Sequence, residues 1–188
     1  ESDWFHNNGL AYDAENDLVL LSARHKDAIV AVNKEDKSLA WILGDPTGWD
    51  GVDQSYFFTP EGEDFEWFYA QHNVSILDNG DIALFDNGTA KVKRVDGDNR
   101  VSGDNVYSRA VVYQIDTENM TVSQVTEYGK ERGADWYSDW ISGVVSLDGT
   151  QDHLWITAGS HLHSDEENRS DYYPKDMFVQ GLTKTTHI

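Results

Sequence analysis

The sequence predicts an all-β fold in which a four-stranded antiparallel sheet recurs along the chain. Helical periodicity is almost absent, and short runs rich in Val, Ile, Leu and aromatic residues dominate. Turn residues, mainly Asp, Asn and Gly, separate these runs. An acidic-aromatic segment that leads to a histidine also occurs twice, before His6 and before His72, and each copy precedes a strand, a turn and a second strand. These three observations indicate a repeated β unit.

The first two repeats each contain four apolar runs of strand length. In the first repeat, the turns at residues 15–17 and 34–37 are too short for a crossover connection, so neighbouring strands are expected to pair antiparallel. The repeats cover residues 3–64 and 66–129. The predicted strands are residues 9–13, 17–24, 28–33 and 38–44 in the first repeat, and 72–77, 81–88, 108–116 and 121–128 in the second.

The turn at Asn79-Gly80 is the clearest hairpin signal in the second repeat. Asn-Gly is the dipeptide that type I′ turns prefer. The surrounding tract, from Asp78 to Asp81, resembles a calcium loop in composition, but a plain hairpin explains it better. An insert rich in Lys, Asp and Gly follows over residues 89–107.

The third repeat, over residues 137–188, is incomplete. Its turn is Asp148-Gly149, and an acidic, poorly patterned segment over residues 163–176 interrupts it. No fourth strand is visible. The strands predicted for it are residues 140–147, 153–159 and 178–182.

Four strands per unit with long inserts are typical of β-propeller blades. We therefore predict a single partial propeller domain of two to three four-stranded antiparallel blades. So few blades cannot close a ring, and open sheet edges favour pairing, so missing chain or self-association between copies is expected to complete the assembly. The chain starts at Glu1 rather than Met, which we interpret as a fragment or a processed product. A β-sandwich of eleven strands is the competing architecture.

Composition excludes several classes of partner. The 188 residues include 14 Lys and Arg against 34 Asp and Glu, a net charge of −20, so nucleic acid and anionic membrane are poor partners. Cysteine is absent, which rules out a disulfide framework, and no run of about 18 apolar residues is present to span a membrane. Seven Trp, nine Tyr and seven Phe residues provide enough large apolar surface for a core.

Four polar residues of the first two repeats are expected to meet at one site. His6 and His72 are predicted to begin the innermost strands of two neighbouring blades, which line the central channel. Arg24 is predicted to end the second strand, so the hairpin returns it to the end of the sheet that holds His6. Asn8 lies two residues after His6 and therefore on the same strand face.

These residue types suit sulfuryl or phosphoryl transfer. A neutral imidazole is a competent nucleophile near pH 7. Arginine offers a fixed fork of donors to a tetrahedral oxyanion, and a second histidine can protonate a leaving group. From the residues alone, structural histidines and an ion-paired Arg24 are the competing interpretation.

A set of motifs in fixed order narrows this choice. The motifs are Asp3-Trp4-Phe5-His6-Asn7-Asn8, Leu21-Ser22-Ala23-Arg24-His25, Trp41-Ile42-Leu43-Gly44-Asp45-Pro46, Gln71-His72, Leu84-Phe85-Asp86-Asn87-Gly88, and Ser108-Arg109-Ala110-Val111 with Tyr113. They span residues 3 to about 116, and jointly they are specific. Together they resemble the bacterial arylsulfate sulfotransferases, which form a six-bladed propeller and move sulfate between phenols without phosphoadenosine phosphosulfate.

The resemblance implies a ping-pong reaction in which His72 is the nucleophile and is transiently sulfated. His6, Asn8 and Arg24 would hold the sulfuryl oxygens and assist the leaving phenol. The substrates would be an aryl sulfate donor and a phenol acceptor, with no cofactor or metal, in a periplasmic or secreted setting. No signal peptide is visible. The family also uses a histidine and aromatic contacts from earlier blades, which this chain lacks, so its activity in isolation stays open.

Two other functions remain open at this stage. One is a non-catalytic propeller module that binds a partner or a carbohydrate. The other is a metal-dependent hydrolase, suggested by His161-Leu162-His163-Ser164-Asp165. This string lacks a further histidine and a partner cluster, which disfavours metal binding.

The remaining aromatic and histidine side chains are assigned mainly to structure. His25 alternates to the strand face opposite Arg24, so it is expected to be structural or solvent-facing. Phe5, Phe68 and Tyr69 are weaker candidates for lining an aryl pocket. Packing between blades is predicted for Trp4, Trp41, Trp67, Trp136, Trp140 and Trp155.

Overall fold

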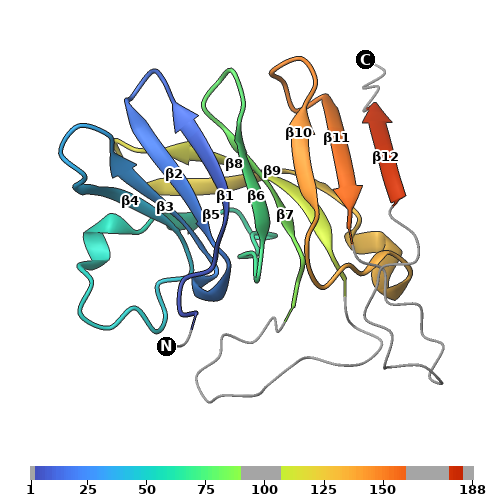
Figure 1. Cartoon of the computed structure of the whole chain (residues 1–188), viewed down its shortest axis with the longest axis horizontal. Coiled ribbons are helices and arrows are strands. Elements are labelled where there is room, and N and C mark those ends of the chain that lie inside the picture. Colours follow the sequence, from blue (N-terminus) through green and yellow to red (C-terminus); the bar gives the residue numbers. More distant parts are fainter. Residues whose placement is uncertain (1–2, 90–106, 160–177, 184–188) are drawn as a thin grey trace.

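The computed structural model describes residues 3–89, 107–159 and 178–183 (Figure 1). The described residues form three separate β-sheets joined by loops and short 3₁₀ segments, and they contain no α-helix. The predicted all-β class is therefore confirmed. None of the helical segments in this part of the chain has the length and apolar character needed to cross a membrane.

The first sheet is a four-stranded antiparallel meander in the order β1-β2-β3-β4. All four predicted strands are present with boundaries shifted by at most two residues. One detail is wrong: Arg24 does not end the second strand but begins a 3₁₀ helix, η1 (Arg24–Lys26), which closes on Asp27 in the left-handed region (φ 51°). The strands are β1 (Asn7–Asp13), β2 (Leu18–Ala23), β3 (Ala28–Asn33) and β4 (Leu39–Gly44).

The second sheet has the order β5-β9-β8-β7-β6, and its last four strands form the predicted antiparallel meander. They are β6 (His72–Ile76), β7 (Ile82–Asp86), β8 (Arg109–Asp116) and β9 (Thr121–Tyr128). The sequence did not predict β5 (Thr59–Glu61), a three-residue strand that runs parallel to β9. Its Thr-Pro-Glu sequence is exposed and has no apolar alternation, so no strand signal precedes its tertiary pairing.

The third sheet contains β10 (Gly143–Ser146), β11 (His153–Ala158) and β12 (Phe178–Thr183), all antiparallel. Strand β10 starts three residues later than predicted, because Ile141 and Ser142 take positive φ angles of 60° and 95°. Two further 3₁₀ segments that were not predicted lie in the connections, η2 (Gln54–Tyr56) and η3 (Lys130–Trp136).

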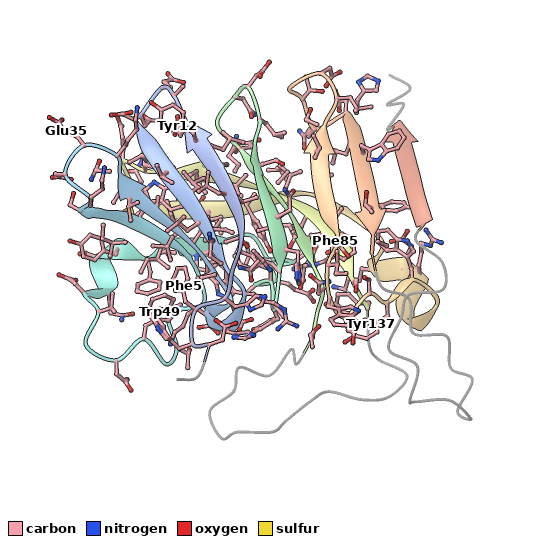
Figure 2. All side chains as sticks on the ribbon, viewed as in Figure 1. Phe5, Tyr12, Glu35, Trp49, Phe85 and Tyr137 are labelled. Carbon is pink, nitrogen blue, oxygen red and sulfur yellow. The ribbon has the colours of Figure 1, made fainter. Side chains whose placement is uncertain are left out.

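The second sheet is buried on both faces, so it forms the middle layer of the described structure. On β7, Leu84 belongs to a core cluster with residues of the first sheet, such as Leu20. Its neighbour Phe85 belongs to a cluster with residues of the third sheet, such as Ile156 (Figure 2). Successive strand residues point to opposite faces, which explains why the whole of β7 is apolar and buried up to Asp86.

The predicted packing role is confirmed for three of the tryptophans, Trp41, Trp67 and Trp136. Trp41 packs edge-on against Phe58, and Trp136 packs against Phe85. Trp67 packs against the first core cluster. Trp4 and Trp155 are largely exposed instead, at 65% and 42%.

Strands β1, β6 and β10, which begin the three meanders, lie next to one another and start at the same end. The hairpins that follow β1, β6 and β10 all lie along the upper edge in Figure 1, so these three strands begin at the lower edge. The approach of β1 to β6 is close: a Cβ atom on Gly9 would lie 2.9 Å from Cα of Asn73. Residues at the starts of these strands are therefore brought together.

Candidate active site

His72 stands at the first position of β6, where the backbone is irregular on both sides. Ala70 and Asn73 both have positive φ angles, 52° and 63°, and the pairing with β7 shifts register between His72 and Ser75. A bulge of this kind changes the direction of a side chain relative to a regular strand. The result is a half-buried imidazole at the end of the sheet.

Both ring nitrogens of His72 are hydrogen-bonded. Nδ1 lies 2.8 Å from Oδ1 of Asn87, and Nε2 lies 3.2 Å from the backbone nitrogen of Ile141. The amide nitrogen of Asn87 donates to the carbonyl oxygens of Ser138 (2.7 Å) and Ile141 (3.0 Å), so its Oδ1 is the atom that faces His72. An amide oxygen only accepts, so Nδ1 carries the hydrogen and the lone pair is on Nε2.

The surroundings keep the imidazole neutral. Burial is the main cause that lowers the pKa of His72 to about 4. The charges of Arg24 and His6 act in the same direction, and the hydrogen bond that the ring donates to Asn87 opposes them. A group with this pKa is an uncharged base at pH 7. His72 therefore presents an available nitrogen lone pair under ordinary conditions.

Asn8 links the first sheet to the residue before His72. Its amide nitrogen donates to the carbonyl oxygen of Gln71 at 2.7 Å. Gln71 is itself buried and donates to the carbonyl of Ala28 at 2.9 Å, which fixes the segment against the first sheet. Oδ1 of Asn8 is buried and makes no hydrogen bond within the described residues.

Arg24 and His6 are joined to each other by backbone and to His72 by electrostatics. The backbone N–H of Arg24 donates to the carbonyl oxygen of His6 at 3.1 Å. The Arg24 guanidinium lies 3.5 Å from the carbonyl oxygen of Asp139, two residues before the amide that reaches Nε2 of His72. Arg24, His72 and Asn87 thus all contact the same loop, residues 138–141.

The ring of His6 has a different environment from that of His72. His6 is exposed, has a positive φ of 49°, and its Nδ1 contacts the carboxylate of Asp3. The His25 ring lies beside it, with 4.7 Å between the ring centroids. His25 is solvent-facing as predicted, but it does not turn away from the predicted site, because strand alternation stops at Ala23 and η1 carries the chain around. Asp3, His6 and His25 are also the described residues placed to share a metal ion.

The segment that leads into His72 is anchored by a buried arginine. Arg109 is fully buried and donates to the Asp86 carboxylate at 2.9 Å and to the carbonyl oxygens of Glu66 and Trp67 at 3.0 and 3.2 Å. The other carboxylate oxygen of Asp86 accepts the backbone N–H of Tyr69 at 3.0 Å. Since Asn87 follows Asp86, one network fixes both the approach to His72 and the partner of its Nδ1.

Sequence reasoning assigned no role to Asn87 or to the Ile141 amide. A signal for Asn87 was present: in an antiparallel hairpin, the end of β7 must lie beside the start of β6, and the observed register pairs His72 with Phe85. No sequence signal points to a backbone amide from another repeat. Phe68, a weaker candidate for an aryl pocket, is wholly buried in the core and lines no site. The string over residues 161–165 lies outside the described residues.

The comparison with known proteins identifies the family. The model of the arylsulfotransferase (ASST) family matches residues 1–185. The chain belongs to the arylsulfotransferase family. Arylsulfate sulfotransferase AssT of Escherichia coli O6:H1 (strain CFT073) is 32% identical over 201 aligned positions, which cover 95% of this chain and 32% of that protein. AssT of Lelliottia amnigena is 33% identical over 203 positions, covering 96% of this chain and 33% of that protein.

The family resemblance seen in the motifs is thus confirmed. The arylsulfotransferase chain described here spans about a third of the length of the curated relatives that it matches. The two regions quoted for His6 and His72 both fall inside the matched residues.

Proposed function

We propose that this chain carries the sulfuryl-accepting half of an aryl sulfotransferase site, with His72 as the nucleophile. The observation that carries the proposal is the state of the His72 ring: Nδ1 donates to Asn87, Nε2 keeps its lone pair, and burial keeps the ring neutral. Arg24, Asn8 and His6 gather around the same strand ends and supply groups for the sulfuryl oxygens and the leaving phenol.

The first step forms a bond between Nε2 of His72 and sulfur and breaks the bond between sulfur and the phenolic oxygen. The ring becomes a sulfated imidazolium, and the phenol leaves as phenolate or takes a proton from His6. The hydrogen bond from Nδ1 to Asn87 strengthens as the ring gains positive charge, so Asn87 stabilises the transition state more than the ground state. Arg24 offsets the negative charge on the sulfuryl oxygens, as cationic groups do in phosphoryl transfer.

The second step reverses these bonds with another phenol. The acceptor oxygen attacks sulfur, the bond from sulfur to Nε2 breaks, and the phenolic proton passes to a neighbouring base, for which His6 is the candidate. The neutral imidazole of His72 is restored. Neither step requires a cofactor or a metal. The reaction is ping-pong because sulfated His72 forms before the acceptor phenol reacts.

The backbone N–H of Ile141 has to release Nε2 of His72 during this cycle. Its N–H points at the lone pair that attacks sulfur. When the sulfuryl group arrives, the N–H is expected to exchange Nε2 for a sulfuryl oxygen, as backbone donors do in oxyanion sites. Ile141, which makes this contact, and Ser142, which follows it in the chain, both have positive φ angles.

We also propose that the three described sheets are blades of a six-bladed propeller, as in the family resemblance. Supporting this, the first strands of consecutive meanders lie side by side and begin at one end (Figure 1). Further blades would have to come from more of the polypeptide or from other copies. A periplasmic or secreted location is proposed on the same resemblance.

Brief exposure to p-nitrophenyl sulfate followed by mass spectrometry tests the function. The expected result is the gain of one sulfuryl group on the peptide that contains His72, and its absence in His72→Asn with an unchanged circular dichroism spectrum. Turnover of the donor that is undiminished in His72→Asn would remove His72 from the mechanism. A protein that binds aryl sulfates but never gains the sulfuryl group would be a binding module instead.

A further inference from the structure

A cluster of three metal-binding side chains lies at the edge of the proposed site. Asp3, His6 and His25 each offer one ligand atom, and these atoms lie within 4.8 Å of one another. All three residues are exposed. None of the bonds described for His72 uses them, and a catalytic role for His6 does not explain why a second imidazole, that of His25, lies beside it.

Backbone hydrogen bonds hold the cluster together. The N–H groups of Arg24 and His25 donate to the carbonyl oxygens of His6 (3.1 Å) and Phe5 (3.2 Å), so the segment before β1 is tied to η1. The backbone N–H of His6 also donates to the Asp3 carboxylate at 3.0 Å. The two imidazole rings are inclined by only 30°, with 4.7 Å between their centroids. The ligands are therefore largely gathered before any ion binds.

The donor set selects one class of ion. Two imidazoles and one carboxylate suit zinc and other late first-row transition metals, whereas magnesium and calcium prefer sites made of oxygen alone. Tetrahedral zinc with bonds of about 2.0–2.1 Å separates its ligand atoms by about 3.3 Å. Exposed side chains reach this spacing from the present one by small rotations. Water would complete the coordination shell.

We propose that Asp3, His6 and His25 bind one divalent transition-metal ion, with Zn²⁺ as the representative. The ion would coordinate the imidazole of His6, so that His6 could no longer act as acid or base in sulfuryl transfer. In that respect the inference rests on the proposed function: metal binding would inhibit the transfer reaction. The binding itself requires only the three side chains.

Calorimetric titration with Zn²⁺ tests the site. His161 and His163 lie outside the described residues and form another histidine pair, so the titrations use a His161→Ala/His163→Ala background. One Zn²⁺ per chain is expected to bind, and Mg²⁺ at equal ionic strength is expected not to compete. Since even an outer-shell partner contributes about 10–100-fold to metal affinity, His25→Ala and Asp3→Asn should each weaken binding at least tenfold.

The chain offers a matched control in His153. This residue is also exposed and also contacts a carboxylate, that of Asp148, but it has no second imidazole beside it among the described residues. His153→Ala is expected to leave Zn²⁺ binding unchanged. Absence of Zn²⁺ binding, or binding that survives both His25→Ala and Asp3→Asn, would overturn the proposal. Unchanged thermal unfolding of each variant without metal shows that the fold is intact.

An activity measurement separates this inference from the proposed function. Sulfuryl transfer from p-nitrophenyl sulfate is expected to fall as Zn²⁺ saturates the site. In His25→Ala the rate is expected to resist Zn²⁺, when it is compared with the rate of the same variant without Zn²⁺. If Zn²⁺ binds through the three residues and the rate is unaffected, the metal site stands and the role of His6 in the transfer is contradicted.

Discussion

At the scale of single residues, the orientation of one imidazole decides what this site can do. Asn87 fixes which nitrogen of His72 carries the hydrogen, because its own amide hydrogens are already committed to two carbonyl oxygens. The position of the lone pair on Nε2 follows from these three hydrogen bonds. The amide is therefore as important for the proposed reaction as the charged groups around it.

Replacement of Asn87 by alanine is expected to lower kcat much more than it changes KM. Without the acceptor, His72 loses both its tautomer preference and the bond that strengthens when the ring becomes cationic. Loss of the correct tautomer in a serine-protease triad costs about 10⁴-fold, and a loss of about 10²–10⁴-fold is expected here. Steady-state kinetics with p-nitrophenyl sulfate measure it. Asn33→Ala, which removes an amide that bonds Ser38 from the end of β3, should leave kcat unchanged.

The pH dependence of the reaction follows from the burial of His72. Its pKa of about 4 in the folded chain predicts that kcat/KM keeps its value between pH 7 and about pH 5 and falls only near pH 4. An acidic limb centred near the ordinary histidine pKa of about 6.5 would show that the ring is not buried as described.

The same pKa makes stability depend on pH. The unfolded chain binds the proton first, because its histidine pKa is higher than that of the folded chain. The free energy of unfolding should therefore fall as pH drops from about 6.5 to about 4. Urea unfolding at several pH values measures this, and His72→Asn should show a shallower fall over that window.

At the scale of elements, the strands around the site are positioned by a close backbone contact and a buried charge network. Gly9 allows β1 to approach Asn73 at the start of β6, and Arg109 ties β8 to the segment before His72. Each feature connects elements far apart in the sequence, so a substitution there should affect stability and site geometry together.

Gly9→Ala is expected to destabilise the fold by about 1–3 kcal/mol, the usual cost of an inserted methyl group that forces backbone shifts. Its Cβ would lie 2.9 and 3.0 Å from two backbone atoms of Asn73. Gly143 faces the same residue from β10, but a Cβ there would lie 3.7 Å from the Asn73 side chain, an ordinary contact. Thermal or urea unfolding of Gly9→Ala and Gly143→Ala compares the two, and equal losses would contradict the close approach.

Arg109→Met should reduce the free energy of unfolding by about 3–5 kcal/mol, as breaking a buried ion pair does. The variant leaves Asp86, itself almost fully buried, without its cation. Lys34→Met removes an exposed ion pair with Asp17 and should cost far less. Urea unfolding of both variants gives the comparison, and a loss in Arg109→Met no larger than in Lys34→Met would show that the network is not buried.

At the scale of the whole molecule, acidic charge dominates. A net charge of −20 on 188 residues implies self-repulsion in the compact state. Raising NaCl from about 0.05 to about 0.5 M shortens the screening length to a few ångströms and should raise Tm. Scanning calorimetry measures this, with sucrose at equal osmolality as the control. A constant or falling Tm would indicate that ion pairs outweigh the repulsion.

The local sequence determined most of the secondary structure of this chain. Eleven strands and the repeat were predictable, because alternation and turn residues act over a few positions. The family was predictable because several contiguous motifs occur in order, and one of these motifs singles out His72 as a candidate. Strand β5 was not predictable, since its three exposed residues become a strand only by pairing with β9.

Tertiary structure alone decided the state of the site. The tautomer of His72 depends on Asn87, which directly follows β7, and on the backbone N–H of Ile141. The low pKa of His72 depends on the burial of its ring. Likewise, His25 joins His6 only because η1 turns the chain where strand alternation would have pointed it away. Hydrogen bonds and desolvation act between groups distant along the chain, so no local pattern encodes them.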